Sequence, residues 1–232
     1  MTFDRQFSLE NYFSEQGELI IENLKSLITK SGESLIGLWG GPDSGKTHLI
    51  NACAHFARQQ AVVFQLYEGN QLVQCDPDYF DIPESCEVLA VDDLDALCGQ
   101  GDWEKNFCQL INRCKRGDLR LIFTLADNPQ FLPCALADFQ SRLSWGLLLQ
   151  LPASEDSDIE RIVRQRANML GFDLSNEVMA YLLTRYSRRL SVQIDILRLL
   201  DAASLSAQKK ITIPLIKQTL LDPAFSQELK RR

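Results

Sequence analysis

The sequence predicts an α/β fold in which helices cover both faces of a parallel sheet, followed by a small all-helical domain. Over the first two thirds of the chain, short apolar runs alternate with longer segments of helical spacing. The runs are apolar almost throughout, as strands buried on both faces are. After Pro152 no such run recurs and only helical spacing remains. The change at Pro152 therefore predicts two domains of different class.

The expected strands and helices follow one another along the first domain. Strands are expected at residues 35–39, 61–66, 87–91, 119–125 and 147–151. Helical spacing lies between them at residues 46–59, 103–114 and 132–143. Because parallel strands need crossover connections, this alternation of strand and helix predicts a parallel sheet.

Four helices are expected in the second domain, over residues 154–171, 175–183, 191–207 and 214–220. Ser154 and Ser175 are of the residue type that caps helix N-termini, and Gly171 is of the type that ends helices. Pro214 suits the first turn of the last helix. We therefore expect an α/β domain at residues 1–152, a helical lid domain at 153–222 and a polar tail at 223–232.

Composition and charge exclude several classes of protein. The chain has 232 residues, of which 45% are hydrophobic and 24% charged, as in ordinary globular proteins. No apolar run approaches the roughly 18 residues of a membrane-spanning helix, and the N-terminus lacks the pattern of a secretory signal, so we expect a cytoplasmic protein without a membrane partner. Lys and Arg number 24 against 31 Asp and Glu, and the resulting charge of −7 disfavours DNA binding through phosphates.

The cysteines and histidines do not form a pattern of metal ligands. There are seven cysteines, no two of them at CxxC spacing, and two histidines, His48 and His55. Structural zinc sites use paired ligands at short spacing. The sequence thus favours free thiols in a reducing compartment over a structural metal site.

The clearest motif is a phosphate-binding loop. Residues 40–47 match GxxxxGK[ST] without a mismatch, between an apolar strand and a helix. The glycines let backbone N–H groups point at an anion, Lys46 would reach the β- and γ-phosphates, and the Thr47 hydroxyl would bind Mg²⁺. The expected ligand is therefore ATP or ADP with Mg²⁺. The residues expected to contact it are Gly40, Gly41, Pro42, Asp43, Ser44, Gly45, Lys46, Thr47 and His48.

A second carboxylate site is expected where the apolar residues 88–91 end in Asp92 and Asp93. Asp92 would bind Mg²⁺, and Asp93 could orient the water that attacks the γ-phosphate. Strands also end at acidic turns for purely structural reasons. The distance of this pair from the phosphate loop favours the magnesium site.

Two further features each have a functional and a structural interpretation. After strand 119–125, Asp127, or alternatively Asn128, could sense the γ-phosphate through the attacking water, but both residues could equally cap a loop before Pro129. Arg142 could act in trans as an arginine finger on a neighbour's nucleotide. A single arginine can also form only a surface ion pair.

Several of these residues together resemble one family. They are the phosphate loop, Asp92-Asp93, the segment 141–146 (Ser-Arg-Leu-Ser-Trp-Gly), the Leu170-Gly171-Phe172 turn and the lid run 201–214. They are similar to the AAA+ module of the bacterial initiator DnaA and its short Hda relatives, and residues 7–13 resemble the start of that module. The resemblance covers about residues 6–221 and implies a P-loop AAA+ fold with a helical lid.

The resemblance also implies a function. In the family, the short nucleotide-bound relatives dock on the DNA-loaded sliding clamp and on ATP-bound DnaA, and an arginine that matches Arg142 promotes hydrolysis by DnaA. ADP favours the active form. Only residues 222–232 follow the lid, too few for a DNA-binding domain, so no sequence-specific DNA binding is expected. The implied role is negative regulation of replication initiation, while self-association stays open.

The N-terminus departs from the family pattern. Family members carry a clamp-binding peptide ahead of the module, and Gln6-Phe7-Ser8-Leu9 fits it loosely. This segment overlaps the start of the module, so Phe7 and Leu9 could instead be core contacts. In that case the clamp would need another docking surface or would not be a partner.

The lid also departs from the pattern, at the arginine that senses the γ-phosphate. An ungapped comparison places Ser191 there, with Arg188 and Arg189 about a turn earlier. One of these arginines could reach the site, because residues three apart share a helix face. A second hypothesis therefore stays open, in which intact phosphate-loop and carboxylate residues make the chain an autonomous AAA+ ATPase of the helicase-loader type.

Overall fold

The computed structural model describes residues 8–12, 14, 16–153, 156–207 and 211–220. The chain divides into two compact units, Met1–Ala153 and Ser154–Arg232. We call them the α/β unit and the helical unit, and each is described by itself. No helix within the described ranges is long and apolar enough to cross a membrane.

The α/β unit contains a five-stranded sheet in which all paired strands are parallel. Its order is β2-β3-β4-β1-β5, so β1 lies beside β4 and β5. Gly37 of β1 is opposite Phe123 and Leu148, and a Cβ at Gly37 would lie 2.6 Å from both side chains. The strands are β1 (Leu35–Trp39), β2 (Phe64–Glu68), β3 (Val88–Asp92), β4 (Arg120–Leu125) and β5 (Leu147–Gln150).

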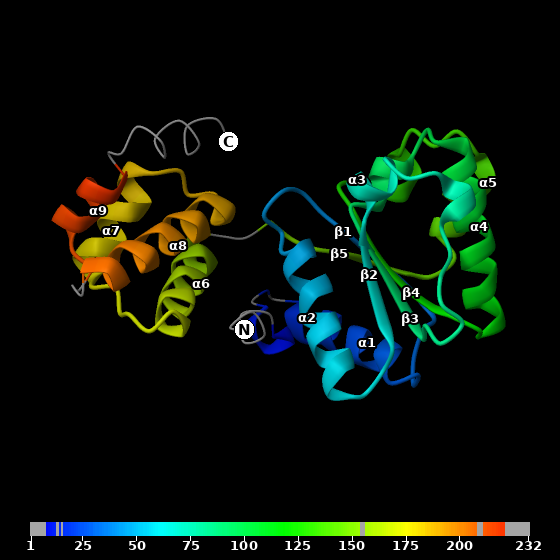
Figure 1. The fold of residues 1–232 in the computed structure, drawn as a ribbon, viewed down its shortest axis with the longest axis horizontal. Helices are drawn as coiled ribbons and strands as arrows, with labels where there is room; N and C mark the ends of the chain where they lie inside the picture. The colour runs from blue at the N-terminus through cyan, green and yellow to red at the C-terminus, as the bar shows by residue number, and fades with distance from the viewer. Residues whose placement is uncertain (1–7, 13, 15, 154–155, 208–210, 221–232) are drawn as a thin grey trace. The chain divides into compact units, whose positions relative to one another are not determined.

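Helices cover both faces of this sheet (Figure 1). On one face, α1 (Gly17–Ile28) and α2 (Lys46–Gln59) pack with the sheet in one apolar cluster. On the other, α4 (Gly101–Arg116) and α5 (Ala137–Leu143) form a second cluster. Shorter helical turns connect these elements: η1 (Leu9–Asn11), α3 (Gly69–Leu72), η2 (Pro77–Tyr79), η3 (Leu94–Leu97) and η4 (Pro129–Phe131).

The helical unit has its own apolar core, which includes Val163, Leu182 and Ile196. Ser175 caps α7, since its Oγ accepts a hydrogen bond from the Val178 N–H at 3.3 Å. The helices of this unit are α6 (Asp156–Met169), α7 (Asn176–Arg185), α8 (Leu190–Ala207) and α9 (Ile213–Leu220). The expected class of both parts of the chain is thus confirmed.

Three elements differ from the sequence-based expectation. Strand β2 begins at Phe64 and not at residue 61, because Ala61 has a φ of 56° and the Val62 N–H bonds back to the end of α2. Helix α5 begins at Ala137 and not at 132, because residues before it form η4 and a loop. Helix α1 was not expected. It buries Ile20, Leu24, Leu27 and Ile28, a helical spacing that the sequence already contains.

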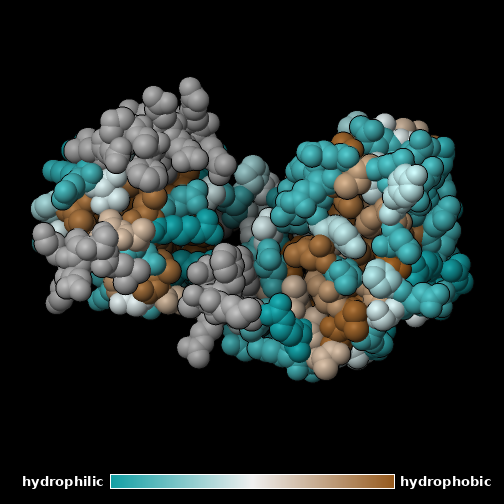
Figure 2. Space-filling model, viewed as in Figure 1, coloured by the Kyte–Doolittle hydropathy of each residue, from teal (hydrophilic) through white to brown (hydrophobic). Residues whose placement is uncertain are grey.

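Apolar side chains also reach the surface of the α/β unit. In Figure 2 they lie over and beside the region that Figure 1 labels β2. Strand β2 is at one end of the sheet order, and its first four residues are half-buried. The edge of the sheet is therefore only partly covered.

Candidate functional site

The phosphate loop connects the carboxyl end of β1 to the first residue of α2. A Cβ at Gly40 would lie 2.6 Å from the Leu151 carbonyl oxygen, and Gly45, the N-cap of α2, has a φ of 91°. Both positions therefore require glycine. Asp43 is also left-handed, with a φ of 61°. The resulting loop stands at a helix N-terminus, where backbone N–H groups favour an anion.

Lys46 is held inside this loop by neutral backbone groups. Its Nζ donates to the Gly40 carbonyl at 2.5 Å and to the Gly41 carbonyl at 2.8 Å. The Ser44 Oγ is buried and has no hydrogen-bond partner among the described residues. Thr47, next to Lys46, is exposed at the start of α2. The loop thus brings together a cation, an unsatisfied hydroxyl and an exposed hydroxyl.

Two carboxylates stand at the carboxyl end of β3, on the strand beside β4. Asp92 is 6% exposed, and its Oδ1 accepts a hydrogen bond from the Thr124 hydroxyl at 2.6 Å. The same hydroxyl oxygen accepts from the Asp93 N–H at 2.8 Å. Thr124 therefore fixes the orientation of Asp92 and the turn at Asp93.

Asp93 lies in a concentration of negative charge. Its pKa is raised, first by partial burial and then by the neighbouring carboxylates of Asp92, Asp95 and Glu68, against a lowering by Lys46. The backbone is left-handed at Asp93, with φ 53° and ψ 50°. A Cβ at Gly69 would overlap the Asp93 carbonyl, so Gly69 permits this close approach. The excess of carboxylate charge favours a bound cation.

The first described residues lie against the phosphate loop. The Tyr12 ring would be 2.8 Å from a Cβ at Gly45. Leu9 is 3% exposed in the core of the α1–α2 face, and the Ser8 Oγ caps η1 through the Glu10 N–H. His48 Nε2 is 3.1 Å from the Ser8 carbonyl oxygen. His48 thus holds the N-terminal segment beside the loop.

This placement bears on the expected clamp peptide. Gln6 and Phe7 lie outside the described residues. Leu9 is buried and Ser8 is a helix cap, which is the structural alternative that the sequence left open. In this conformation the Leu9 side chain is not displayed to a partner.

Asp127 and Asn128 follow β4 and form a loop cap. The Asp127 Oδ1 accepts from the Asn128 N–H at 2.7 Å, and the Asn128 Oδ1 accepts from the Gln130 N–H at 3.0 Å. Asn128 is the N-cap of η4. Both side-chain oxygens therefore have local structural roles in this state.

Arg142, on α5, is held by groups of its own unit. Its Nε and Nη2 donate to the two Asp138 carboxylate oxygens, at 2.9 and 2.7 Å. Its Nη1 donates to the Asn112 side chain and to the Cys108 carbonyl of α4. The ring centroid of Trp145 lies 5.1 Å from the guanidinium carbon. The Asp138 hydrogen bonds raise the pKa of Arg142, whose side chain is 18% exposed.

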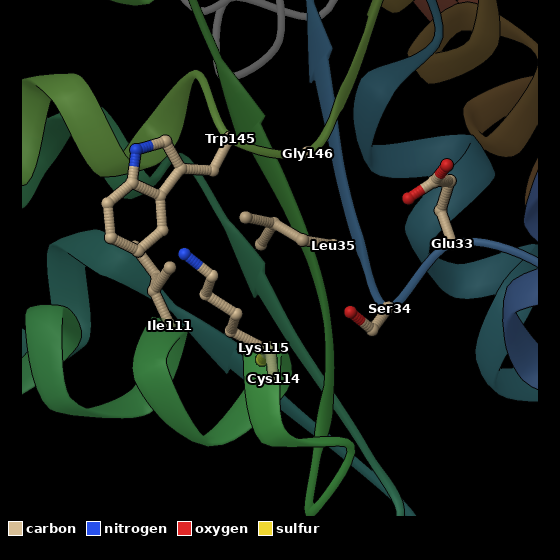
Figure 3. Close-up of a pocket in the computed structure, with 8 residues that line it drawn as sticks. All are labelled: Glu33, Ser34, Leu35, Ile111, Cys114, Lys115, Trp145 and Gly146. Carbon is tan, nitrogen blue, oxygen red and sulfur yellow. The ribbon is translucent and has the colours of Figure 1, made fainter.

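A pocket of about 350 Å³ lies beside Trp145 (Figure 3). The Lys115 side chain extends from α4 toward the indole, with its Nζ 4.4 Å from the ring centroid. Residues 33–35 line the pocket at the amino end of β1, whereas the phosphate loop follows the carboxyl end of that strand. The pocket therefore lies at the amino ends of the strands, opposite the end at which the phosphate loop lies.

The three candidate lid residues lie in the helical unit around the start of α8. Arg188 is exposed and its Nε donates to the Leu183 carbonyl at 3.2 Å. Arg189 is exposed, and its carbonyl accepts from the Gln193 N–H. Ser191 is half-buried in the first turn of α8. The α8 N-terminus thus presents two exposed arginines.

Comparison with known proteins identifies the family to which this fold belongs. The family described as "Hda, lid domain" matches residues 156–220. An uncharacterised protein of Haemophilus influenzae is 31% identical over 221 residues, which cover 92% of this chain and 93% of the relative. The chain belongs to the Hda-like, DnaA-related AAA+ proteins.

Solved structures share the fold of this Hda-like chain. Domain III of the Thermotoga maritima replication initiation protein DnaA has a TM-score of 0.78 at 17% identity, over 94% of this chain and 97% of that one. AMPPCP-bound DnaA from Aquifex aeolicus has a TM-score of 0.69 at 20% identity, over 89% and 70%. A Thermotoga maritima RuvB variant has a TM-score of 0.69 at 16% identity, over 95% and 73%.

Two polar residues of this Hda-like site were not anticipated from the sequence. Thr124 is the single polar residue inside the apolar run of β4, and that interruption was the available signal. Asp138 precedes Arg142 by four residues, the spacing at which opposite charges pair on a helix. The contacts of Arg142 with α4 depend on packing between helices distant in sequence.

Proposed function

We propose that this Hda-like protein is a nucleotide-switched negative regulator of chromosomal replication initiation. It binds ADP or ATP in its phosphate loop and promotes hydrolysis of ATP bound to DnaA, together with the DNA-loaded sliding clamp. The main observation behind the proposal is that Arg142 lies on α5 in a chain with an intact phosphate loop. Membership in the Hda-like family supports it.

The phosphate loop fits an adenine nucleotide. Among the described residues, the hydrogen bonds of the Lys46 ammonium go to carbonyl oxygens, so phosphate oxygens can replace them without loss of an ion pair. The buried Ser44 hydroxyl has no hydrogen-bond partner among the described residues, and a phosphate oxygen would supply one. AMPPCP-bound DnaA, with the same fold, supports an adenine ligand. The residues that would hold the nucleotide are Gly40 through Thr47, with His48 beside them.

The carboxylates fit Mg²⁺. The Asp92 carboxylate has one oxygen fixed by Thr124, and Asp93 has a raised pKa among like charges. A divalent cation held by Thr47 and Asp92 would neutralise phosphate charge. Asp93 would then orient water, and Asp127 or Asn128 would have to leave its loop cap to act as a sensor.

Arg142 acts in trans in this proposal. A guanidinium that approaches a γ-phosphate stabilises the charge of the transition state and contributes roughly 10³–10⁵ in rate. All three nitrogens of Arg142 already have partners, so a phosphate has to replace the Asp138 carboxylate. Binding to DnaA would supply the energy for this exchange. The finger is therefore active only in the complex.

The clamp would be bound in one of two ways. If residues 6–9 are the clamp peptide, Leu9 has to leave the core, which costs the burial of a leucine. Otherwise the clamp contacts another surface of the α/β unit. An assay with and without clamp distinguishes a clamp-dependent activity from one that needs DnaA alone.

The decisive experiment loads DnaA with labelled ATP and follows hydrolysis with this protein, ADP and clamp on DNA. We expect stimulation by the parent and a loss of roughly 1,000-fold or more with Arg142→Ala, the range that arginine fingers contribute. Arg116→Ala is the matched control, since Arg116 also pairs with an aspartate but does so on the exposed surface. No stimulation by a folded, nucleotide-bound parent would refute the proposal.

A second candidate function is an autonomous ATPase of the helicase-loader type. The geometry of Thr124 favours it, because a preoriented Asp92 is also what intrinsic hydrolysis requires. Phosphate release by the protein alone, abolished by Lys46→Ala, would support this function. Retention of ADP with no release above that variant would support the switch.

A further inference from the structure

Two thiols of the α/β unit lie within contact distance of each other. The Sγ atoms of Cys98 and Cys134 are 3.3 Å apart, although the residues are 36 positions apart in the chain. Both side chains are partly exposed. Within the described part of the chain, no other two sulfur atoms are in hydrogen-bond contact. The pair therefore has both proximity and access to small molecules.

The backbone around the pair is fixed by one buried carboxylate. Glu104 of α4 is fully buried and accepts from the Gly99 N–H at 2.7 Å and the Ala135 N–H at 2.8 Å through Oε1. Its Oε2 accepts from the Leu136 N–H at 2.6 Å. The residues immediately after each cysteine thus share an anchor. Joining the two sulfurs requires little movement of either segment.

The two thiols are chemically unequal. Burial raises the pKa of both thiols, and the hydrogen bond between them raises the pKa of Cys98 further but lowers that of Cys134. Cys134 therefore forms a thiolate more readily than its partner. Since the thiolate is the nucleophile, Cys134 is the sulfur that attacks first.

We propose that Cys98 and Cys134 are a modification site at which a low-molecular-weight disulfide forms a reversible intramolecular disulfide. The Cys134 thiolate attacks one sulfur of the oxidant, and a small thiol leaves. The Cys98 thiolate then attacks the Cys134 sulfur of the mixed disulfide, and the second small thiol leaves. The protein loses two protons and two electrons, and the small disulfide gains them as two thiols.

This bond would connect two functional segments of the α/β unit. Cys98 directly follows η3, the turn after Asp92 and Asp93, and Cys134 lies between η4 and α5, which carries Arg142. A disulfide there would restrain α5 relative to the carboxylate segment. It would also close a long loop of chain, which raises stability by restricting the unfolded state.

The test treats the full chain with oxidised glutathione, alkylates the remaining thiols under denaturing conditions and maps tryptic peptides by mass spectrometry. Lys105 and Arg120 separate the two cysteines, so trypsin leaves them on different peptides. We expect a Cys98–Cys134 cross-linked peptide, the loss of two of the seven thiols, and reversal by dithiothreitol. The thermal midpoint should rise on oxidation.

Three variants make the test specific. Cys98→Ser should accumulate a glutathione adduct on Cys134, because the resolving sulfur is gone, whereas Cys134→Ser should accumulate much less adduct on Cys98. Cys75→Ser, at the exposed cysteine, should cross-link as the parent does. Glutathione adducts without a cross-link, a cross-link that persists in Cys98→Ser, or only intermolecular disulfides would overturn the proposal.

Discussion

Lys46 and Arg142 are two cations of the same unit, and both are held by the chain itself, but by partners of different chemistry. The Lys46 ammonium contacts two backbone carbonyls. The Arg142 guanidinium is paired in two-point fashion with the Asp138 carboxylate and also contacts α4. Exchange of carbonyls for phosphate adds an ion pair at Lys46. Exchange at Arg142 replaces one ion pair with another.

The difference indicates that Lys46 can bind a phosphate without a protein partner, whereas Arg142 needs one. In the proposed function, free nucleotide is sufficient to displace neutral dipoles from Lys46, since charge-assisted hydrogen bonds are the stronger ones. Arg142 gains little from a phosphate in solution, because it leaves Asp138 and the Trp145 ring to reach it. Only an interface that contributes further contacts makes that exchange favourable.

The largest effect on nucleotide binding is expected at Lys46. Lys46→Ala should weaken binding of a fluorescent ADP by roughly 10- to 100-fold, since hydrogen bonds to charged groups contribute about 1.5–3 kcal/mol. Lys115→Ala is the control, because that ammonium lies over Trp145 at the other edge of the sheet. Equal affinities of the two variants would contradict a role for Lys46 in nucleotide binding.

The next effect concerns the carboxylates beside Lys46. Thr124→Val keeps the shape of the side chain but leaves the Asp93 N–H and the Asp92 Oδ1 without their partner. The free energy of unfolding should fall by about 1–3 kcal/mol, as for a lost buried hydrogen bond. Urea denaturation measures it, with the exposed Thr29→Val as control. An unchanged midpoint would show that water replaces the hydroxyl.

A smaller effect is expected at the paired cation. Asp138→Asn weakens the ion pair that holds Arg142, so stimulated hydrolysis of DnaA-bound ATP should rise roughly two- to fivefold, the scale of exposed ion pairs. The control is Asp118→Asn, which weakens the exposed pair with Arg116. A lower rate in the Asp138 variant would mean that the carboxylate orients the guanidinium for catalysis.

The smallest effect depends on pH. The raised pKa of Asp93 means that the folded state binds the proton more tightly than the unfolded state, so folding stability falls as pH rises from the ordinary aspartate range through the raised pKa. Asp93→Asn removes this penalty. The variant should be more stable than the parent at neutral pH by about 0.5 kcal/mol, a figure reduced for solvent screening, and equal to it at low pH. Urea denaturation at several pH values checks the sign, and a difference that grew on acidification would contradict it.

The sequence was most informative where one local signal decides the structure. The bounds of α2 were predicted to the residue, because the motif fixes its start at Lys46 and the apolar spacing ends at Gln59. Strand β2 was displaced, because the apolar residues Ala61 and Val62 belong to the turn that ends α2. Apolar character alone does not separate a helix C-cap from a strand.

The sequence was least informative where contacts join distant segments. Arg142 was identified, but its contacts with Cys108 and Asn112 arise from the packing of α5 on α4. The approach of Cys98 to Cys134 likewise depends on two loops that meet through Glu104. Residue spacing along the chain does not predict these contacts, because both form only when the α/β unit is folded.

The Glu104 carboxylate also makes the start of α5 depend on α4. Helix α5 has seven residues, far below the roughly 12–15 at which an isolated helix becomes even marginal in water. Its N-cap residue Leu136 offers no side-chain cap, and the Leu136 N–H is bound instead by Glu104, 32 residues earlier. Helix α5, and Arg142 with it, therefore depends on α4 for the hydrogen bond at its N-terminus. The position of Arg142 at the surface of α5 is consequently set by a carboxylate of α4 as well as by the ion pair with Asp138.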